Sequence, residues 1–163
     1  MLAVDGPSGA GKSTLARQIA AELVERGVRA ECVSTDEFAT WDEPVSWWPR
    51  LETGVLEPLR AGRPGVYRRV SWSDGVPGPG EEVEIAVPDV LVLEGVSSGR
   101  ARIRPSLSLL LWLDGGTETE RLERTVGRDG EESRAELRRW QLFERGWFAV
   151  DGTRKAADVR SCQ

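Results

Sequence analysis

The chain has 163 residues, of which 39% are hydrophobic and 30% are charged, and this length suits one globular domain that needs no disulfide or metal staple. Its formal net charge of -5 at pH 7 argues against the basic excess by which proteins bind nucleic acid or anionic membranes. Histidine is absent, so the usual zinc ligand and the usual general base are both missing. Any catalysis must use carboxylates, lysine or arginine, and we expect the partner to be a small molecule.

Targeting signals are not visible in the sequence. No apolar run is long enough to span a membrane, and the first residues lack a basic segment followed by an apolar stretch. These observations predict a cytoplasmic location.

Apolar runs and helical spacing alternate along the chain. The runs predict strands at residues 1–4, 30–34, 89–93 and 108–113, and AADVR near the C-terminus is expected to add a short final strand. Helical patterns cover residues 13–26, 45–61, 117–126 and 132–148. Two alternating stretches, VYRRVSW and EEVEIAV, flank the Gly- and Pro-rich SDGVPGPGE and predict a β-hairpin at about residues 65–88.

Strands that are separated by helices predict an α/β fold. We expect a parallel sheet of about five strands with helices on both faces, joined by right-handed crossovers, with the small β-hairpin attached as a flap. Residues 1–163 should form a single domain.

The segment GPSGAGKS matches the pattern G-x-x-x-x-G-K-[ST] and stands between a predicted strand and a predicted helix, where a phosphate-binding loop (P-loop) must lie. Backbone N–H groups of such a loop surround the phosphates, aided by the positive end of the helix dipole. Lys12 would reach the β and γ phosphates, and Ser13 would hold Mg²⁺. The alternative, a glycine-rich turn that binds nothing, fits this placement poorly. The predicted nucleotide-binding residues are Gly6, Ser8, Gly9, Ala10, Gly11, Lys12, Ser13 and Thr14.

The rest of the chain narrows the class of P-loop protein. The guanine-reading N-K-x-D of switch GTPases does not occur, and the chain is short for an ATPase motor. A small-molecule kinase remains the best interpretation.

Together with the P-loop, STDEF after the second predicted strand and LVLEG at the end of the third make most of the chain resemble the uridine kinase-like family of P-loop kinases. The resemblance implies a P-loop NTPase fold and an enzyme that uses ATP and Mg²⁺ to phosphorylate a hydroxyl group. It also implies that Asp36 lies beside the acceptor hydroxyl as the general base, a role that suits phosphoryl transfer. The alternative is that Asp36 only caps a helix.

Two further groups of residues extend the expected site. Glu94 follows a buried strand at the carboxyl edge of the sheet, where ligands of α/β sheets collect, and could orient Mg²⁺ or contact the acceptor. ETERLERTVGRDG resembles the lid of these kinases, at about residues 117–130, and Arg124 and Arg128 share a helical stripe from which they would close over the transferring phosphate. The alternatives are a solvated carboxylate and an exposed face of Glu–Arg pairs.

Aromatic residues gather between the second and third predicted strands of the sheet, where the family places its acceptor pocket. Their rings would stack on a base or another flat ring, although some of them must be core or surface instead. The predicted acceptor-binding residues are Asp36, Phe38, Trp41, Tyr67, Arg68 and Glu94.

The sequence leaves three functions open. The first is a kinase for a hydroxyl of a nucleoside or a similar small molecule. The second is a nucleoside monophosphate kinase, because DGPSGAGKST also resembles the cytidylate kinase loop. The basic residues that could hold its acceptor phosphate are Arg50, Arg60, Arg63, Arg68 and Arg69. The third is a regulatory module that binds ATP without transferring phosphate.

Overall fold

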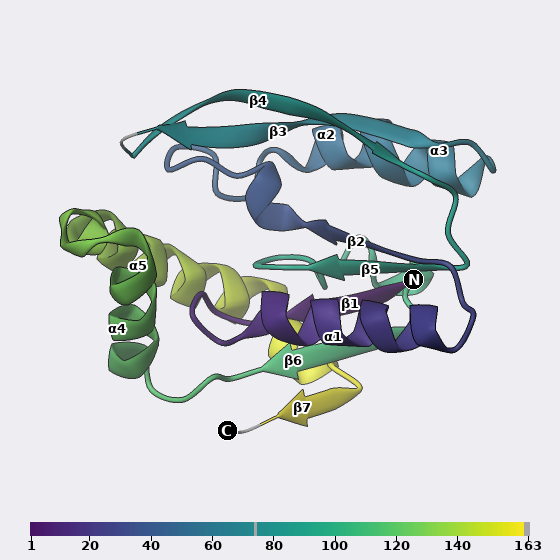
Figure 1. Cartoon of the computed structure of the whole chain (residues 1–163). Coiled ribbons are helices and arrows are strands. Elements are labelled where there is room, and N and C mark those ends of the chain that lie inside the picture. Colours follow the sequence, from purple (N-terminus) through teal and green to yellow (C-terminus); the bar gives the residue numbers. More distant parts are fainter. Residues whose placement is uncertain (74, 162–163) are drawn as a thin grey trace.

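A computed structural model describes residues 1–73 and 75–161. Its centre is a five-stranded parallel sheet with the strand order β2-β5-β1-β6-β7 (Figure 1), as the alternation of strands and helices predicts. In chain order, the strands of this sheet are β1 (Leu2–Asp5), β2 (Ala30–Ser34), β5 (Val90–Glu94), β6 (Leu109–Leu113) and β7 (Val159–Ser161).

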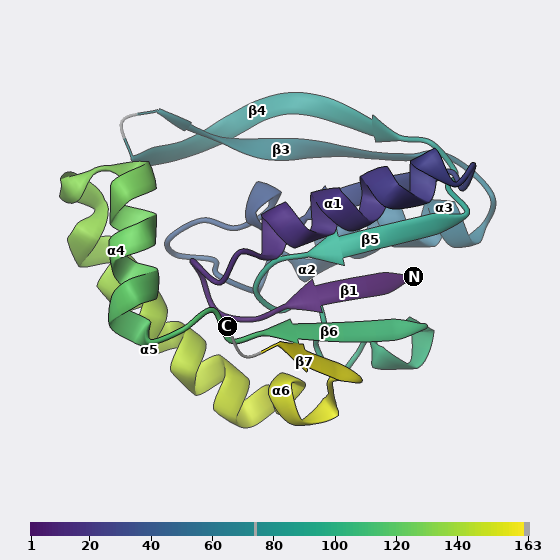
Figure 2. The same ribbon diagram turned by 60° about the horizontal axis from the view of Figure 1, so that its bottom comes forward.

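Helices cover both faces of the sheet (Figures 1 and 2). On one face, α1 (Lys12–Glu25) packs Ala16 against Val4 of β1 and Val92 of β5. On the other face, the last turn of α5 (Arg134–Asp151) places Phe148 against Trp112 of β6, and the short α6 (Thr153–Ala156) follows. The helix α4 (Glu118–Asp129) stands beside α5 at the carboxyl ends of the strands.

The helix expected at residues 45–61 is shorter and irregular. It consists of α2 (Trp48–Leu51), a π-helical segment η2 (Glu52–Leu56) and α3 (Glu57–Arg60) in direct succession. Pro58 cannot donate a hydrogen bond to the carbonyl of Gly54, and its ring crowds that carbonyl, so a wider helical turn before it relieves the conflict. This segment carries Leu51 and Val55 into the largest part of the core, against Val33 of β2.

The predicted hairpin is present as β3 (Gly65–Ser73) and β4 (Val76–Ile85), which pair in antiparallel register with an irregularity between Arg68 and Val70. Residue 74, between the two strands, lies outside the described residues. Tyr67 and Ile85 anchor the hairpin in the core beside η2 and α2. Within the described residues, no helix is both long enough and apolar enough to cross a bilayer.

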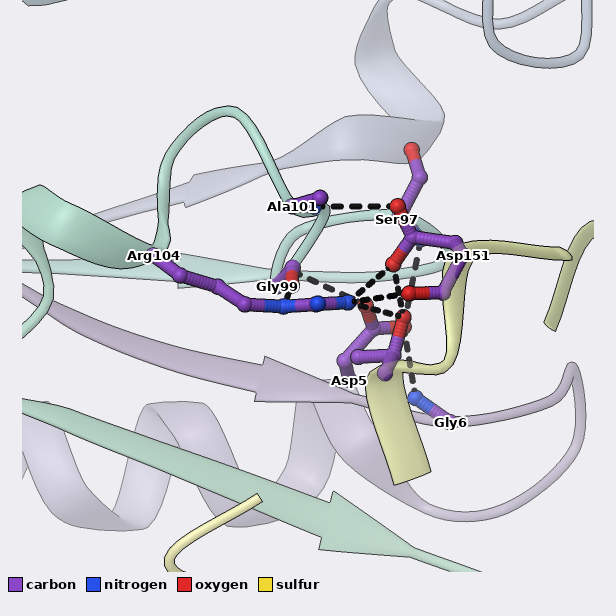
Figure 3. Close-up of polar contacts among 8 residues, drawn as sticks. Asp5, Gly6, Ser97, Gly99, Ala101, Arg104 and Asp151 are labelled. Atoms are coloured by element: carbon purple, nitrogen blue, oxygen red, sulfur yellow. Dashed lines mark hydrogen bonds and ion pairs between the residues drawn. The ribbon is translucent and has the colours of Figure 1, made fainter. Parts of the chain in front are cut away.

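A buried carboxylate ties together the loops that follow β1 and β5. Asp5 is fully buried and accepts hydrogen bonds from the backbone N–H groups of Gly6 (2.7 Å), Ser97 (3.1 Å) and Gly99 (2.8 Å). The carbonyl of Gly99 in turn accepts from Arg104, which forms an ion pair with Asp151 at the end of α5 (Figure 3). Burial is the main reason that the pKa of Asp5 rises to about 7 despite these donors and the charge of Lys12.

Asp5→Asn should lower the free energy of unfolding by about 1–3 kcal/mol. The amide NH₂ would replace one of the two carboxylate oxygens, so at least one backbone N–H would lose its acceptor and face another donor. Urea unfolding at pH 7 would measure the change, with the exposed Asp42→Asn as the matched control. Equal stability of Asp5→Asn and the unmodified chain would mean that these three hydrogen bonds do not hold the loops.

Candidate functional site

The P-loop connects β1 to α1 and adopts the backbone conformations that its glycines allow. Gly6, Gly9 and Gly11 have φ values of 144°, 75° and 91°, which side-chain-bearing residues rarely adopt. A Cβ on Gly6 would lie 2.2 Å from the carbonyl oxygen of Leu113, and one on Gly9 would lie 2.6 Å from that of Arg121. The loop is therefore enclosed by the last residue of β6 and by α4.

Lys12 begins α1 and is 6% exposed, with its Nζ donating to the carbonyl oxygen of Pro7 at 2.9 Å. The ammonium group thus lies against the loop itself. A cavity of about 150 Å³ opens beside it. The residues that line this cavity are Ser8, Gly9, Gly11, Lys12, Ser13, Asp36, Arg124, Thr125 and Arg128.

Asp36 reaches this cavity from a 3₁₀ turn, η1 (Thr35–Glu37), which directly follows β2. The side chain of Ser34 accepts the hydrogen bond from the backbone N–H of Asp36 at 3.3 Å, so Ser34 supplies the capping oxygen of this turn. The carboxylate of Asp36 is not needed for that cap, and Asp36 lines the same cavity as the P-loop residues.

Glu94 ends β5 and is 3% exposed. Burial, followed by the charge of Asp36, raises the pKa of Glu94, while hydrogen bonds with the Ser34 and Ser13 side chains and the charge of Lys12 oppose the rise. Its Oε2 is buried without a hydrogen-bond partner among the described residues. A buried carboxylate oxygen with no donor, beside the hydroxyl of Ser13, fits a Mg²⁺ ion, which binds proteins through one or two oxygen ligands and keeps its waters and phosphate oxygens.

The described residues contain no group of three or more His, Cys, Asp or Glu side chains that would hold a metal ion unaided.

Two arginines of α4, Arg124 and Arg128, also line the cavity. Arg124 donates to the carbonyl oxygen of Gly9 (2.9 Å) and also to that of Gly115. Arg128 pairs with Asp129 through Nε (2.5 Å), and its pKa is raised first by that hydrogen bond and further by the charges of Asp36 and Glu94. Both arginines therefore line the same cavity as the P-loop.

Of the predicted acceptor-side residues, Asp36 lines this cavity, whereas Glu94, Phe38, Trp41, Tyr67 and Arg68 are not among its lining residues. Phe38 is 0% exposed and stacks between Trp47 (ring centroids 5.5 Å apart) and Tyr67 (4.7 Å), so it is a core residue. The hydroxyl of Tyr67 donates to Glu37, and the pKa of Tyr67 is raised mainly by burial.

Arg68 and Trp41 are also engaged elsewhere. Arg68 is exposed on β3 and contacts β4 through the carbonyl of Gly80 (2.9 Å) and the carboxylate of Glu82 (3.6 Å). Trp41 packs edge-on against Trp72 of the hairpin and Trp140 of α5. It therefore bridges the hairpin and the helices that stand over the P-loop.

Two residues of α5 that the sequence patterns do not single out contact the P-loop. Glu144 accepts hydrogen bonds from Ser8, and the indole N–H of Trp140 donates to the Ser8 hydroxyl at 3.1 Å. The only sequence signal was a glutamate placed one turn after a tryptophan in an otherwise aromatic helix face, which has no fixed functional meaning.

No model of a known protein family matches the chain, and no curated protein matches its sequence. Among solved structures, the chain is similar to one described as a possible uridine kinase from Bacillus stearothermophilus, with a TM-score of 0.70 and 20% identity over 99% of this chain and 87% of that one. It is also similar to a candidate fructose transport system kinase from Silicibacter sp. TM1040, with a TM-score of 0.66 and 20% identity over 99% of this chain and 88% of the other. The chain therefore has the α/β fold of P-loop kinases.

Proposed function

We propose that this chain is an ATP- and Mg²⁺-dependent kinase that transfers the γ-phosphate to a hydroxyl of a nucleoside or a similar small molecule. The observation that carries the proposal is the meeting of the P-loop, one carboxylate and two guanidinium groups in a single cavity. A loop that only bound phosphate would need no carboxylate at its open side. The P-loop kinase fold of the structural neighbours supports the same reading.

The nucleotide's phosphates would lie along the P-loop, held by its N–H groups and by Lys12, which would exchange its contact with Pro7 for a phosphate oxygen. Ser13 and Glu94 are the residues that would hold Mg²⁺, Glu94 directly or through water. When bound, the ion would offset negative charge on the β and γ phosphates.

Asp36 would accept the proton of the acceptor hydroxyl as its oxygen attacks the γ-phosphorus and the bond to the bridging oxygen of ADP breaks. Arg124 and Arg128 would neutralise charge on the transferring group, for which planar guanidinium groups are suited. Residues 117–130 would act as a lid over the cavity and exclude water, which competes with the acceptor for the phosphoryl group.

For the acceptor, we propose a hydroxylated small molecule. The names of the two neighbours mention uridine and fructose, and both compounds carry hydroxyl groups. A nucleoside monophosphate kinase has less support, because three of the five arginines considered for its acceptor phosphate are engaged within the chain. Arg50 donates to the carbonyl of Phe38 (2.5 Å), Arg60 pairs with Glu52 (2.5 Å) and Arg68 pairs with Glu82 (3.6 Å). A small acceptor, rather than a nucleic acid or a membrane, also agrees with the net charge of -5.

ADP release from Mg·ATP should increase when the purified protein meets its acceptor in a panel of nucleosides, nucleoside monophosphates, sugars and hydroxy acids. Asp36→Asn should reduce that stimulated rate by about 10²- to 10⁴-fold because the general base is lost, and Lys12→Ala should weaken nucleotide binding as well. Arg26→Ala, an exposed variant at the C-terminal end of α1 whose side chain pairs with Glu22, is the control and should keep the rate. Tight ATP binding with no stimulation by any compound would favour the regulatory module instead.

The affinity for Mg·ATP should depend on pH through the protonation of Glu94. Because burial and Asp36 raise its pKa, Glu94 takes up a proton at a higher pH than an exposed glutamate does, and the neutral acid is a poor partner for Mg²⁺. Affinity for Mg·ATP should therefore fall as pH is lowered, beginning above the ordinary titration range of glutamate, and should recover with added Mg²⁺. Calorimetric titrations at several pH values would measure this, and Glu94→Gln should bind Mg·ATP weakly at every pH. If the affinity of the unmodified chain for Mg·ATP stays constant as the pH is lowered, Glu94 does not help to hold Mg²⁺.

A further inference from the structure

We propose that Glu144 of α5 is a positioning residue that holds Ser8, and with it the P-loop, in the conformation that receives the triphosphate. The inference rests on the proposed function, because it concerns how the same loop takes up nucleotide. It assigns a role to a helix that the phosphate-binding pattern does not include.

The contacts are specific to one loop residue. The backbone N–H of Ser8 donates to Oε1 of Glu144 at 2.9 Å, and the Ser8 hydroxyl donates to the same oxygen. That hydroxyl also accepts from the indole N–H of Trp140 at 3.1 Å. Trp140 and Glu144 are four residues apart and so share one face of α5. Both polar groups of Ser8 are thereby fixed from a single helix.

The charged form of the Glu144 carboxylate is unfavourable in its buried position unless nearby donors or cations stabilise it. Glu144 is 2% exposed, and burying a charge without partners is strongly unfavourable. Burial raises the pKa of Glu144, while the charge of Lys12 and the hydrogen bonds from Ser8 lower it. The compensation therefore comes chiefly from the P-loop, which means that the loop and Glu144 stabilise one another.

The neighbouring helix holds the next residue of the loop. Arg124 of α4 donates to the carbonyl oxygen of Gly9, directly after Ser8. The helices α4 and α5 are themselves joined by the ion pair of Glu123 with Arg134 (2.6 Å) and by a hydrogen bond from Gln141 to the carbonyl of Glu118 (3.0 Å). Two consecutive loop residues are thus held by two connected helices, one through a carboxylate and one through a guanidinium group.

The contacts of Ser8 limit which hydrogen-bond donors of the P-loop remain for the phosphates. Ser8 is predicted from the sequence to bind the nucleotide, but its N–H and its hydroxyl proton are directed to Glu144. The donors for phosphate would therefore come from the residues that follow Ser8. Glu144 therefore acts on the nucleotide only through the shape of the loop, which separates its role from those of Lys12 and Ser13.

The test compares Glu144→Ala with Glu144→Gln, which keeps an acceptor oxygen for Ser8 but removes the charge. Glu144→Ala should raise the Kd for Mg·ATP by about 10- to 100-fold, the loss expected when two hydrogen bonds are removed. Glu144→Gln should stay within about threefold of the unmodified chain, because its amide oxygen still accepts both hydrogen bonds. Glu136→Ala, at a partly exposed α5 position that pairs with Arg139, should leave the Kd unchanged. Calorimetric titration with Mg·ATP measures all three.

Amide hydrogen exchange supplies a readout that does not depend on nucleotide. In Glu144→Ala the amides of residues 8–11 should exchange faster, while those of β1 and β5 keep their original rates. If Glu144→Ala proves too unstable to purify, Ser8→Ala removes only the hydroxyl contact and should raise the Kd by a smaller factor.

Three results would overturn the inference: an unchanged Kd in folded Glu144→Ala, equal losses in Glu144→Ala and Glu144→Gln, or loop amides that exchange at the original rate. Failure of the unmodified chain to bind Mg·ATP would instead overturn the proposed function, and the exchange measurement would still decide whether Glu144 holds the loop.

Discussion

The close approach of the P-loop to two neighbouring backbones is the constraint on which the site depends. Gly6 lies against the carbonyl of Leu113 and Gly9 against that of Arg121, at separations where a Cβ would overlap the oxygen. With β6 and α4 packed as they are, neither loop position has room for a side chain. Because α4 also carries Arg124 and Arg128, the fit that encloses the loop also brings the two guanidinium groups to the cavity.

Charge around Lys12 is the second organising feature. Three buried carboxylates, those of Asp5, Glu94 and Glu144, come from β1, β5 and α5, and the charge of Lys12 lowers the pKa of each. One ammonium group cannot offset three carboxylates, and burial keeps all three pKa values raised. A triphosphate would add more negative charge to this region. That is the physical reason why our proposed function needs Mg²⁺ and the arginines of α4 as well as the loop.

Much of this arrangement could be predicted from the sequence, because it depends on local patterns. The P-loop has a fixed spacing, the strands have apolar runs bounded by turn residues, and the hairpin has alternating residues on either side of a Gly- and Pro-rich turn. Asp36 and Glu94 follow strands of one parallel sheet, so the topology alone brings them to the same edge as the loop. The five-stranded sheet and the hairpin are confirmed.

Other features have no local signal. An aromatic residue between two strands can line a pocket or fill the core, and only the packing of Phe38 between Trp47 and Tyr67 decides for the core. The contact of Glu144 with Ser8 joins residues 136 positions apart, which no short pattern can predict. The irregular helix at residues 48–60 reflects a conflict at Pro58 that helical periodicity does not register.

The measurement that tests the central claim most directly is the fate of the γ-phosphate. The purified protein would be incubated with Mg²⁺, ATP labelled at the γ-phosphate and a pool of small metabolites, and the labelled products would be separated and identified by mass spectrometry. Our account predicts a labelled phosphate ester of a hydroxylated small molecule, absent when Asp36 is replaced by Asn. Label that remains in ATP, or that appears only as inorganic phosphate across a complete metabolite pool, would contradict it.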